Sequence, residues 1–202
     1  MSAISSRFEG RPESVLVLPR EQEVTAPEPV AGYSVQGLPR ALDSVWIDIH
    51  RKAVPRYARP DLVNWLERYR RLSLSEGILL ATEDATREPV ATAGSLANPK
   101  DEMFPDGGQL GWVATVPEHR GRGLANWLCS LATIRLRSDG FKRVFVSTGE
   151  DMPEAIRVYM RLGYVPCLFA VDQRERWMRI CDDIGSPFEP DRWPTLEEYA
   201  AD

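Results

Sequence analysis

The chain has 202 residues, of which 43% are hydrophobic and 27% are charged, and its formal net charge is −5. These values are ordinary for one medium-sized globular domain with ample core. The acidic balance, with a sequence pI near 5.2, argues against a general nucleic-acid-binding surface.

The first residues, MSAISSRFEG, lack the apolar centre of a signal peptide, and VLVL at residues 15–18 is too short to supply one. Farther along, no apolar run approaches the ~18 residues that a membrane helix needs. The three cysteines, Cys129, Cys167 and Cys181, are odd in number and widely spaced, and no close Cys/His pairs accompany them. The sequence therefore predicts a cytoplasmic protein with reduced core cysteines, no membrane partner and no metal.

The organisation along the chain suggests three parts. Residues 1–30 mix proline and glutamate with one short apolar run, which is typical of a partly ordered extension that holds at most one short strand. Residues 31–183 carry the regular patterns of a single domain. Residues 184–202 contain three prolines, and we expect them to be a tail packed on the domain.

The domain is expected to open with a strand and two helices. Residues Tyr33 to Gln36 alternate like a strand, and Pro39 begins a helix that runs through about Val54. A second helix runs from Asp61 to Leu72. Its apolar stripe consists of Leu62, Trp65, Leu66 and Tyr69.

Three strands and a helix are expected next. Residues 77–83 and 89–96 are typical of two antiparallel strands, and a loop follows over 100–108. The apolar, β-prone run LGWVATV at 110–116 predicts another strand. Residues 124–137, LANWLCSLATIRLR, are rich in helix formers at helical spacing and predict a long helix.

The turn between that strand and that helix is typical of an anion site. A helix start has unpaired N–H donors and the positive end of the helix dipole. Because Gly121 and Gly123 lack Cβ atoms, a phosphate can approach their backbone closely. Arg120 and Arg122 add positive charge, so the segment predicts a site for a phosphorylated cofactor, whereas the neighbouring His119 is expected to be a solvated loop residue.

The last part of the domain is expected to contain a strand, a helix and a hairpin. Residues 143–148 predict a strand, and Pro153 suits the first turn of a helix that ends before Gly163. Residues 165–172 and 174–181 are interpreted as the two strands of a terminal hairpin.

Two motifs on these elements identify a family. The spacing around the glycines lacks the third glycine of a dinucleotide fold and the Gly-Lys-Ser/Thr of a P-loop. Instead, VPEHRGRGLA at 116–125 matches a Val-x-Pro step followed by Arg/Gln-x-x-Gly-x-Gly/Ala. Downstream, AIRVYMRLGY at 155–164 matches A-x-x-x-Y-x-x-L-G-F/Y. Together, over roughly 31–181, the chain resembles the GNAT family of N-acetyltransferases.

The resemblance implies an α/β (α+β) fold with a mixed, mostly antiparallel sheet of six to seven strands and about four flanking helices. It also implies acetyl-coenzyme A (acetyl-CoA) as the cosubstrate, with its pyrophosphate at the glycine loop and its pantetheine arm on the preceding strand. The residues implied for cofactor binding are Val113, Ala114, Thr115, Arg120, Gly121, Arg122, Gly123, Leu124, Ala125 and Asn126.

The same resemblance implies that Tyr159 protonates the departing thiolate, since a phenol stays protonated at pH 7 and can donate a proton. The attacking amine must lose a proton to a base, and the identity of that base stays open. The strand at 110–116 has no carboxylate, and Met152 stands where the family often has Asn. Glu150, Asp151 and an ordered water are the alternatives.

Two function classes follow. The first is an acetyl-CoA-dependent N-acetyltransferase that acts on a primary amine of a small molecule or peptide by direct attack on the thioester. The alternative is a non-catalytic acyl-CoA-binding sensor or scaffold module of the same fold. Nucleic acid is not an expected partner, and the sequence leaves a homodimer open.

Overall fold

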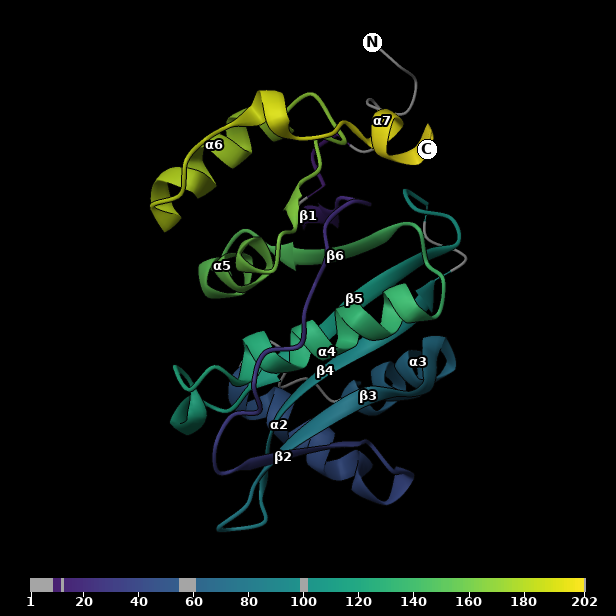
Figure 1. Cartoon of the computed structure of the whole chain (residues 1–202), viewed down its shortest axis with the longest axis vertical. Helices are drawn as coiled ribbons and strands as arrows, with labels where there is room; N and C mark the ends of the chain where they lie inside the picture. Colours follow the sequence, from purple (N-terminus) through teal and green to yellow (C-terminus); the bar gives the residue numbers. More distant parts are fainter. Residues whose placement is uncertain (1–8, 12, 55–60, 99–101, 202) are drawn as a thin grey trace.

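The structure is a computed structural model that describes residues 9–11, 13–54, 61–98 and 102–201 (Figure 1). Seven strands form one sheet in the order β2-β3-β4-β5-β6-β1-β7. All neighbouring strands are antiparallel except β5 and β6, which are parallel. The expected mixed, mostly antiparallel sheet is therefore confirmed. The strands are β1 (Glu13–Leu18), β2 (Tyr33–Gly37), β3 (Ser73–Glu83), β4 (Pro89–Asn98), β5 (Gly107–Thr115), β6 (Val144–Gly149) and β7 (Val165–Pro166).

Helices cover both faces of the sheet. In Figure 1, α4 and α5 lie in front of the sheet and α2 and α3 lie behind it. The α-helices of the described residues are α2 (Asp43–Ala53), α3 (Leu62–Leu72), α4 (Leu124–Ser138), α5 (Pro153–Arg161), α6 (Gln173–Ile184) and α7 (Leu196–Ala201). Short 3-10 turns are η1 (Arg40–Leu42), η3 (Pro117–His119) and η4 (Pro190–Arg192).

The stripe expected on α3 is correct at three of its four positions. Leu62, Leu66 and Tyr69 are each 2% exposed, whereas Trp65 is 42% exposed. The Trp65 indole N–H donates to Asp61 Oδ2 at 2.9 Å, which holds this ring at the helix surface. Trp65 is therefore a surface aromatic residue rather than a core residue.

The apolar run VLVL forms the end of β1, which lies inside the sheet between β6 and β7. Its residues 15–18 are at most 1% exposed. Continuous burial on both faces explains why the run is apolar throughout rather than alternating. A strand from the expected N-terminal extension thus completes the sheet of the expected domain.

The predicted terminal hairpin is wrong. Its first strand is reduced to β7, and residues 174–181 lie in α6. Trp177, Ile180, Cys181 and Ile184 are all buried, and their i, i+3, i+4, i+7 spacing is that of a helix. In the sheet, β1 pairs with β6 and the short β7 pairs with the other edge of β1. Residues 174–181 therefore form no strand of the sheet.

The C-terminal tail is fastened to the sheet through Tyr199 in α7. The Tyr199 hydroxyl accepts the Val144 N–H at 3.0 Å and lies 2.9 Å from the Leu18 carbonyl oxygen. Leu168 also forms a parallel bridge with Thr195. These contacts hold residues 195–201 beside β1 and β6.

Cys129, Cys167 and Cys181 are buried free thiols, and burial raises the pKa of each. Among the helices that the structure describes, none has both the length and the apolar character needed to cross a bilayer. The expected loop at 100–108 lies partly outside the described residues, and its last two residues belong to β5.

Candidate active site

The parallel strands β5 and β6 separate in the middle of the sheet. They pair only between residues 108–110 and residues 144–146. Beyond this point β6 stays paired with β1 as far as Gly149, while β5 stays paired with β4 as far as Thr115. Within the described residues, the β5 edge over 111–115 therefore has no ladder partner in β6. The backbone N–H and C=O groups of such an edge can pair with a ligand where no side chain already bonds to them. The Thr115 carbonyl oxygen is one that is taken, since it accepts a hydrogen bond from Arg120 Nε at 3.3 Å.

A bulge lies at the start of this separated part of β5. Thr92 is opposite Ala114 and Gly94 is opposite Gly111, so two β5 residues face one residue of β4. One of the two is Trp112, whose φ of +52° is in the left-handed region. For a bulky residue this conformation costs about 1–3 kcal/mol, and it persists only where the surroundings enforce it.

Aromatic rings from α2 and α3 provide those surroundings. The Trp112 ring has its centroid 5.4 Å from that of Trp46 and 5.6 Å from those of Trp65 and Tyr69. His50 is buried in the same cluster, with its Nδ1 3.0 Å from the Trp46 carbonyl oxygen. Burial lowers the pKa of His50 to about 4, so its ring is neutral at pH 7. The bulge is thus fixed from behind by packed rings.

The glycine loop follows η3 and leads into α4. Gly121 and Gly123 have φ values of +75° and +86°, which explains why glycine occupies both positions. Gly123 is the N-cap of α4, and its carbonyl oxygen accepts the Trp127 N–H at 3.0 Å. The N–H groups of residues 124–126 therefore point out of the helix start, and the first turn carries no acidic residue. This geometry suits a phosphate group.

The two arginines of the loop hold it in place. Arg120 donates from Nη2 to the Ala53 carbonyl oxygen at 2.6 Å and from Nε to the Thr115 carbonyl oxygen at 3.3 Å. Arg122 donates to the Tyr33 hydroxyl at 2.7 Å. Their guanidinium groups therefore tie the loop to α2, β5 and β2, in addition to placing positive charge there.

His119 belongs to the same hydrogen-bonded group. Its Nδ1 lies 2.8 Å from the Tyr33 hydroxyl, and its side chain is only 13% exposed. Glu83 completes the group, since its Oε1 is 3.8 Å from Arg122 Nη1. The expectation that His119 is a solvated loop residue is wrong, because β2 and the end of β3 cover it.

Tyr159 lies on the buried side of α5, the helix that follows β6. It is 4% exposed, and its ring meets that of Tyr164 edge to face at a centroid distance of 6.3 Å. The Tyr164 hydroxyl lies 2.9 Å from Thr133 Oγ1 in α4, and α5 contacts α4 directly. Thus α5, which carries Tyr159, packs against α4, which begins directly after the glycine loop.

Glu150, one alternative for the base, forms an ion pair with Arg176 of α6. Arg176 is 8% exposed, and its Nη1 also lies 3.3 Å from Asp172 Oδ2. It donates further to the carbonyl oxygens of Arg11 and Glu13. The Glu150 carboxylate is thus fixed to the junction of β1 and α6, while Asp151 is exposed.

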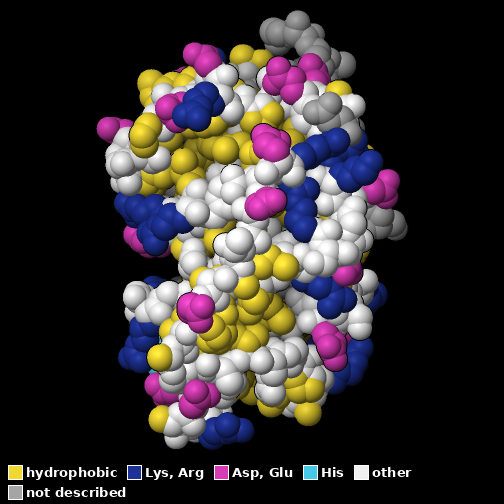
Figure 2. Space-filling view, in the orientation of Figure 1, with side chains coloured by type: hydrophobic (Ala, Val, Ile, Leu, Met, Phe, Trp, Pro, Cys, Tyr) yellow, Lys and Arg dark blue, Asp and Glu magenta, His cyan; other side chains and the backbone are white. Residues whose placement is uncertain are grey.

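Figure 2 shows a notch at the left margin of this face, between α5 above and the loop preceding α4 below. The glycine loop and α5 border this notch, and the separation of β5 from β6 lies behind it (Figure 1). The predicted cofactor residues on β5 and the loop are contiguous with α4, and Tyr159 is on the helix opposite.

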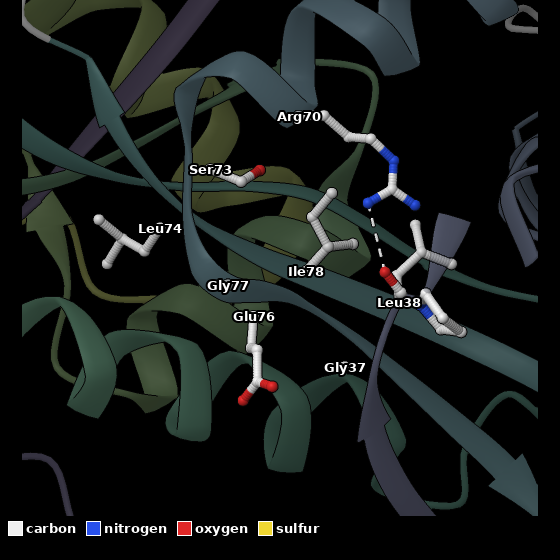
Figure 3. A pocket seen from close by; sticks show the side chains of 9 residues that line it. Gly37, Leu38, Arg70, Ser73, Leu74, Glu76, Gly77 and Ile78 are labelled. Carbon is white, nitrogen blue, oxygen red and sulfur yellow. Dashed lines mark hydrogen bonds between the residues drawn. The ribbon is translucent and has the colours of Figure 1, made fainter. Parts of the chain in front are cut away.

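A separate hollow of about 310 Å³ lies where β2 meets the first half of β3. Figure 3 shows Arg70 at this hollow, with its guanidinium donating to the Leu38 carbonyl oxygen at 3.3 Å. The same guanidinium forms an ion pair with Asp43. Its arginine is paired with a carboxylate and Glu76 also lines it, whereas the glycine loop adds the N–H groups of a helix start, so this hollow is a weaker candidate for an anionic ligand.

Comparison with known proteins identifies the family of the chain. Residues 41–164, more than half of the chain, match the model of the acetyltransferase (GNAT) family. No curated protein matches the chain.

Solved structures share the fold at low identity. A GCN5-related N-acetyltransferase from Sphaerobacter thermophilus is 23% identical with a TM-score of 0.59, over 77% of this chain and 49% of that one. A putative GNAT acetyltransferase from Novosphingobium aromaticivorans is 19% identical with a TM-score of 0.55, over 76% of this chain and 59% of that one. The aminoglycoside N-acetyltransferase AAC(6')-Iy, solved in complex with CoA, is 15% identical with a TM-score of 0.52, over 65% of this chain and 86% of that one. The chain thus spans only about half of the Sphaerobacter protein.

Proposed function

Because the chain belongs to the acetyltransferase (GNAT) family, in which acetyl transfer from acyl-CoA is the general activity, we propose that it is an N-acetyltransferase. In this proposal it transfers the acetyl group of acetyl-CoA to a primary amine of a small molecule or peptide. One observation carries the proposal: the part of β5 that has separated from β6 runs directly into the glycine loop at the start of α4. In CoA the pantetheine arm is linked at one end to the pyrophosphate. The arm would therefore lie along β5 and the pyrophosphate at the glycine loop.

The residues fit acetyl-CoA in charge and in shape. The N–H groups of Leu124, Ala125 and Asn126 and the backbone of residues 120–123 would bind the pyrophosphate. The backbone of Val113, Ala114 and Thr115 would pair with the amides of the pantetheine arm. Thr115 Oγ1 is buried and has no hydrogen-bond partner among the described residues, so this end of β5 offers a further polar atom.

Acetyl-CoA would supply an activated acyl group as a thioester. The role of the protein is to align the amine with it and to manage two protons. Tyr159 is proposed to donate its hydroxyl proton to the sulfur that departs. The ion pair with Arg176 disfavours Glu150 as the base, so we propose that Asp151 or an ordered water takes the proton from the amine.

The alternative, an acyl-CoA-binding module without catalysis, is supported by the lack of a carboxylate on β5 and by the engagement of Glu150. The two functions differ in turnover but not in cofactor binding.

The test combines calorimetry with a thiol assay. The protein is titrated with acetyl-CoA, and free thiol is then followed in the presence of pooled amines that include amino acids, polyamines, amino sugars and peptides. Binding with amine-dependent thiol release supports the enzyme. Binding without release from any amine favours the module, and absence of binding contradicts both.

A further inference from the structure

The connection between β1 and β2, residues 19–32, crosses the face that carries α4 and α5 (Figure 1). We call this segment the strap. At its first residue, Pro19, the carbonyl oxygen accepts a hydrogen bond from Arg137 Nη2 in the last turn of α4 at 2.7 Å. Near its end, Val30 lies beside Gly123 at the first turn of the same helix. The strap therefore follows α4 from its C-terminal to its N-terminal end.

The strap contacts the turn after α5 and the glycine loop, in each case at a glycine. A Cβ on Gly163, in the turn after α5, would lie only 2.5 Å from Gln22 Cδ. Glycine suits position 163 for two reasons: its φ is +90°, and a side chain there would collide with the strap. Without that side chain the strap can lie against the turn that ends α5. A Cβ on Gly123 would lie 3.8 Å from Val30 Cγ2, so Val30 stands against the glycine loop.

The strap is anchored at both ends and exposed between them. It leaves β1, which is buried, and enters β2 at Tyr33, which is 8% exposed. Val24 and Val30 are partly buried and pack on the core, while residues 25, 26, 28 and 29 are exposed. Such a segment has a defined path but few contacts of its own, so a ligand in the notch can order it further.

We propose that the strap is the outer wall of the cofactor cleft, that it covers the nucleotide end of bound CoA, and that Val30 is a positioning residue for the glycine loop. This inference rests on the proposed function. A phosphate at the start of α4 lies next to Val30, whose apolar side chain excludes water from the backbone donors. Their attraction for the phosphate is stronger where water is excluded. The segment before β2 thus contributes to the cofactor site as well as to the sheet.

The first test is hydrogen exchange of the full chain with and without saturating CoA, followed by mass spectrometry. We expect amide exchange in residues 20–32 to slow by at least about tenfold when CoA binds. The partly exposed connection at 186–189, which follows α6 at the other end of the molecule (Figure 1), serves as the internal control and should not change. Equal exchange in the strap with and without CoA overturns the inference.

The second test places a negative charge on the strap. Val30→Asp should raise the Kd for CoA by at least about tenfold, because the new carboxylate lies near the phosphates. Val63→Asp is the matched control, since Val63 is 54% exposed on α3 and lies on the opposite face of the sheet. Val30→Asn, which has the shape without the charge, should bind CoA more tightly than Val30→Asp.

The outcomes separate the inference from the proposed function. If the wild type binds CoA while Val30→Asp binds as well as Val63→Asp, the strap inference is wrong and the proposed function stands. If the wild type does not bind CoA, the proposed function fails first and the inference fails with it. If Val30→Asp does not fold, hydrogen exchange of the wild type alone decides.

Discussion

Tyr69 and Gly111 are joined by a buried hydrogen bond in which the tyrosine hydroxyl donates to the glycine carbonyl oxygen at 3.1 Å. Gly111 is the first β5 residue beyond the pairing with β6, so a side chain of α3 fixes the strand where the site opens. Burial, with a smaller contribution from Cys129, raises the pKa of Tyr69 well above its ordinary value. The phenol therefore stays protonated and remains a donor at neutral pH.

This bond requires a glycine on the neighbouring strand. A Cβ on Gly94 of β4 would overlap the Tyr69 hydroxyl oxygen, so Gly94→Ala should destabilise the fold by about 1–3 kcal/mol or more. Gly37→Ala in β2 is the control, because a Cβ there would meet only ordinary contacts, the nearest at 3.5 Å. Thermal unfolding of the two variants gives the comparison.

A double variant identifies the cause. Tyr69→Phe removes the overlapping oxygen and leaves the ring carbon Cζ 2.6 Å from the added Cβ, so Gly94→Ala should be less damaging in that background than in the wild type, though still destabilising. If the two effects simply add, the clash with the Tyr69 hydroxyl is not the reason that position 94 is glycine.

The central part of the fold could be predicted from the sequence because each of its elements is encoded by a pattern of neighbouring residues. The glycine loop, the strand before it and the helix after it are contiguous, and α3, β6 and α5 follow from spacing within a few residues. The order of the elements, together with the two motifs, was sufficient for the family.

The contacts that complete the site join distant parts of the chain, and local patterns do not contain them. Arg122 and Tyr33 are 89 residues apart, and Arg176 and Glu150 are 26 apart. The place of β1 beside β6 is likewise a pairing of strands separated by most of the chain. The helical spacing of Trp177, Ile180 and Ile184 was a local signal for α6 that the hairpin interpretation missed.

The buried His50 makes the fold sensitive to acid. Burial lowers the pKa of His50 in the folded state to about 4, below its ordinary value of 6.5, so the unfolded chain binds the proton more readily. The stability that this group contributes is present above pH 6.5 and is lost as the pH falls toward 4. From pH 6.5 to 5 the loss should be about 2 kcal/mol.

Urea unfolding at several pH values measures this effect. His50→Phe keeps an aromatic ring but cannot bind a proton, so its free energy of unfolding should fall less between pH 6.5 and 5 than that of the wild type. Parallel pH profiles would show that other groups cause the acid sensitivity.

Ligand choice provides a direct check on the cofactor. Acetyl-CoA should raise the thermal midpoint more than NADH or ATP at equal concentration, because only acetyl-CoA has a pantetheine arm to pair with residues 113–115. Equal protection by all three would indicate a general phosphate site instead.

The glycine loop has a matched control at the other end of α4. Gly123→Asp should abolish CoA binding, because it adds a side chain and a negative charge at the pyrophosphate site. Gly140 also has a positive φ, +90°, and open space around it, so Gly140→Asp imposes similar backbone strain of about 1–2 kcal/mol far from the loop. Calorimetry should show unchanged affinity for Gly140→Asp, and equal affinities in both variants would contradict the proposed site.

Tyr159→Phe tests the proposed acid most directly. The change keeps the buried ring and removes only the hydroxyl, so the affinity for CoA should hardly change. General acid catalysis is typically worth ~10²–10⁴-fold, which corresponds to about 3–5 kcal/mol of barrier. We therefore expect kcat to fall by at least about tenfold on a good amine, with the KM for acetyl-CoA nearly constant.

Tyr164→Phe is the control for this prediction, because Tyr164 is buried beside Tyr159 and its hydroxyl bonds to Thr133. Losing that bond should lower stability by about 1 kcal/mol and leave kcat within about twofold. If Tyr159→Phe behaves like Tyr164→Phe, with reduced stability and intact turnover, then Tyr159 is a core residue. The proton for the departing thiolate must in that case come from water or from another side chain at the notch.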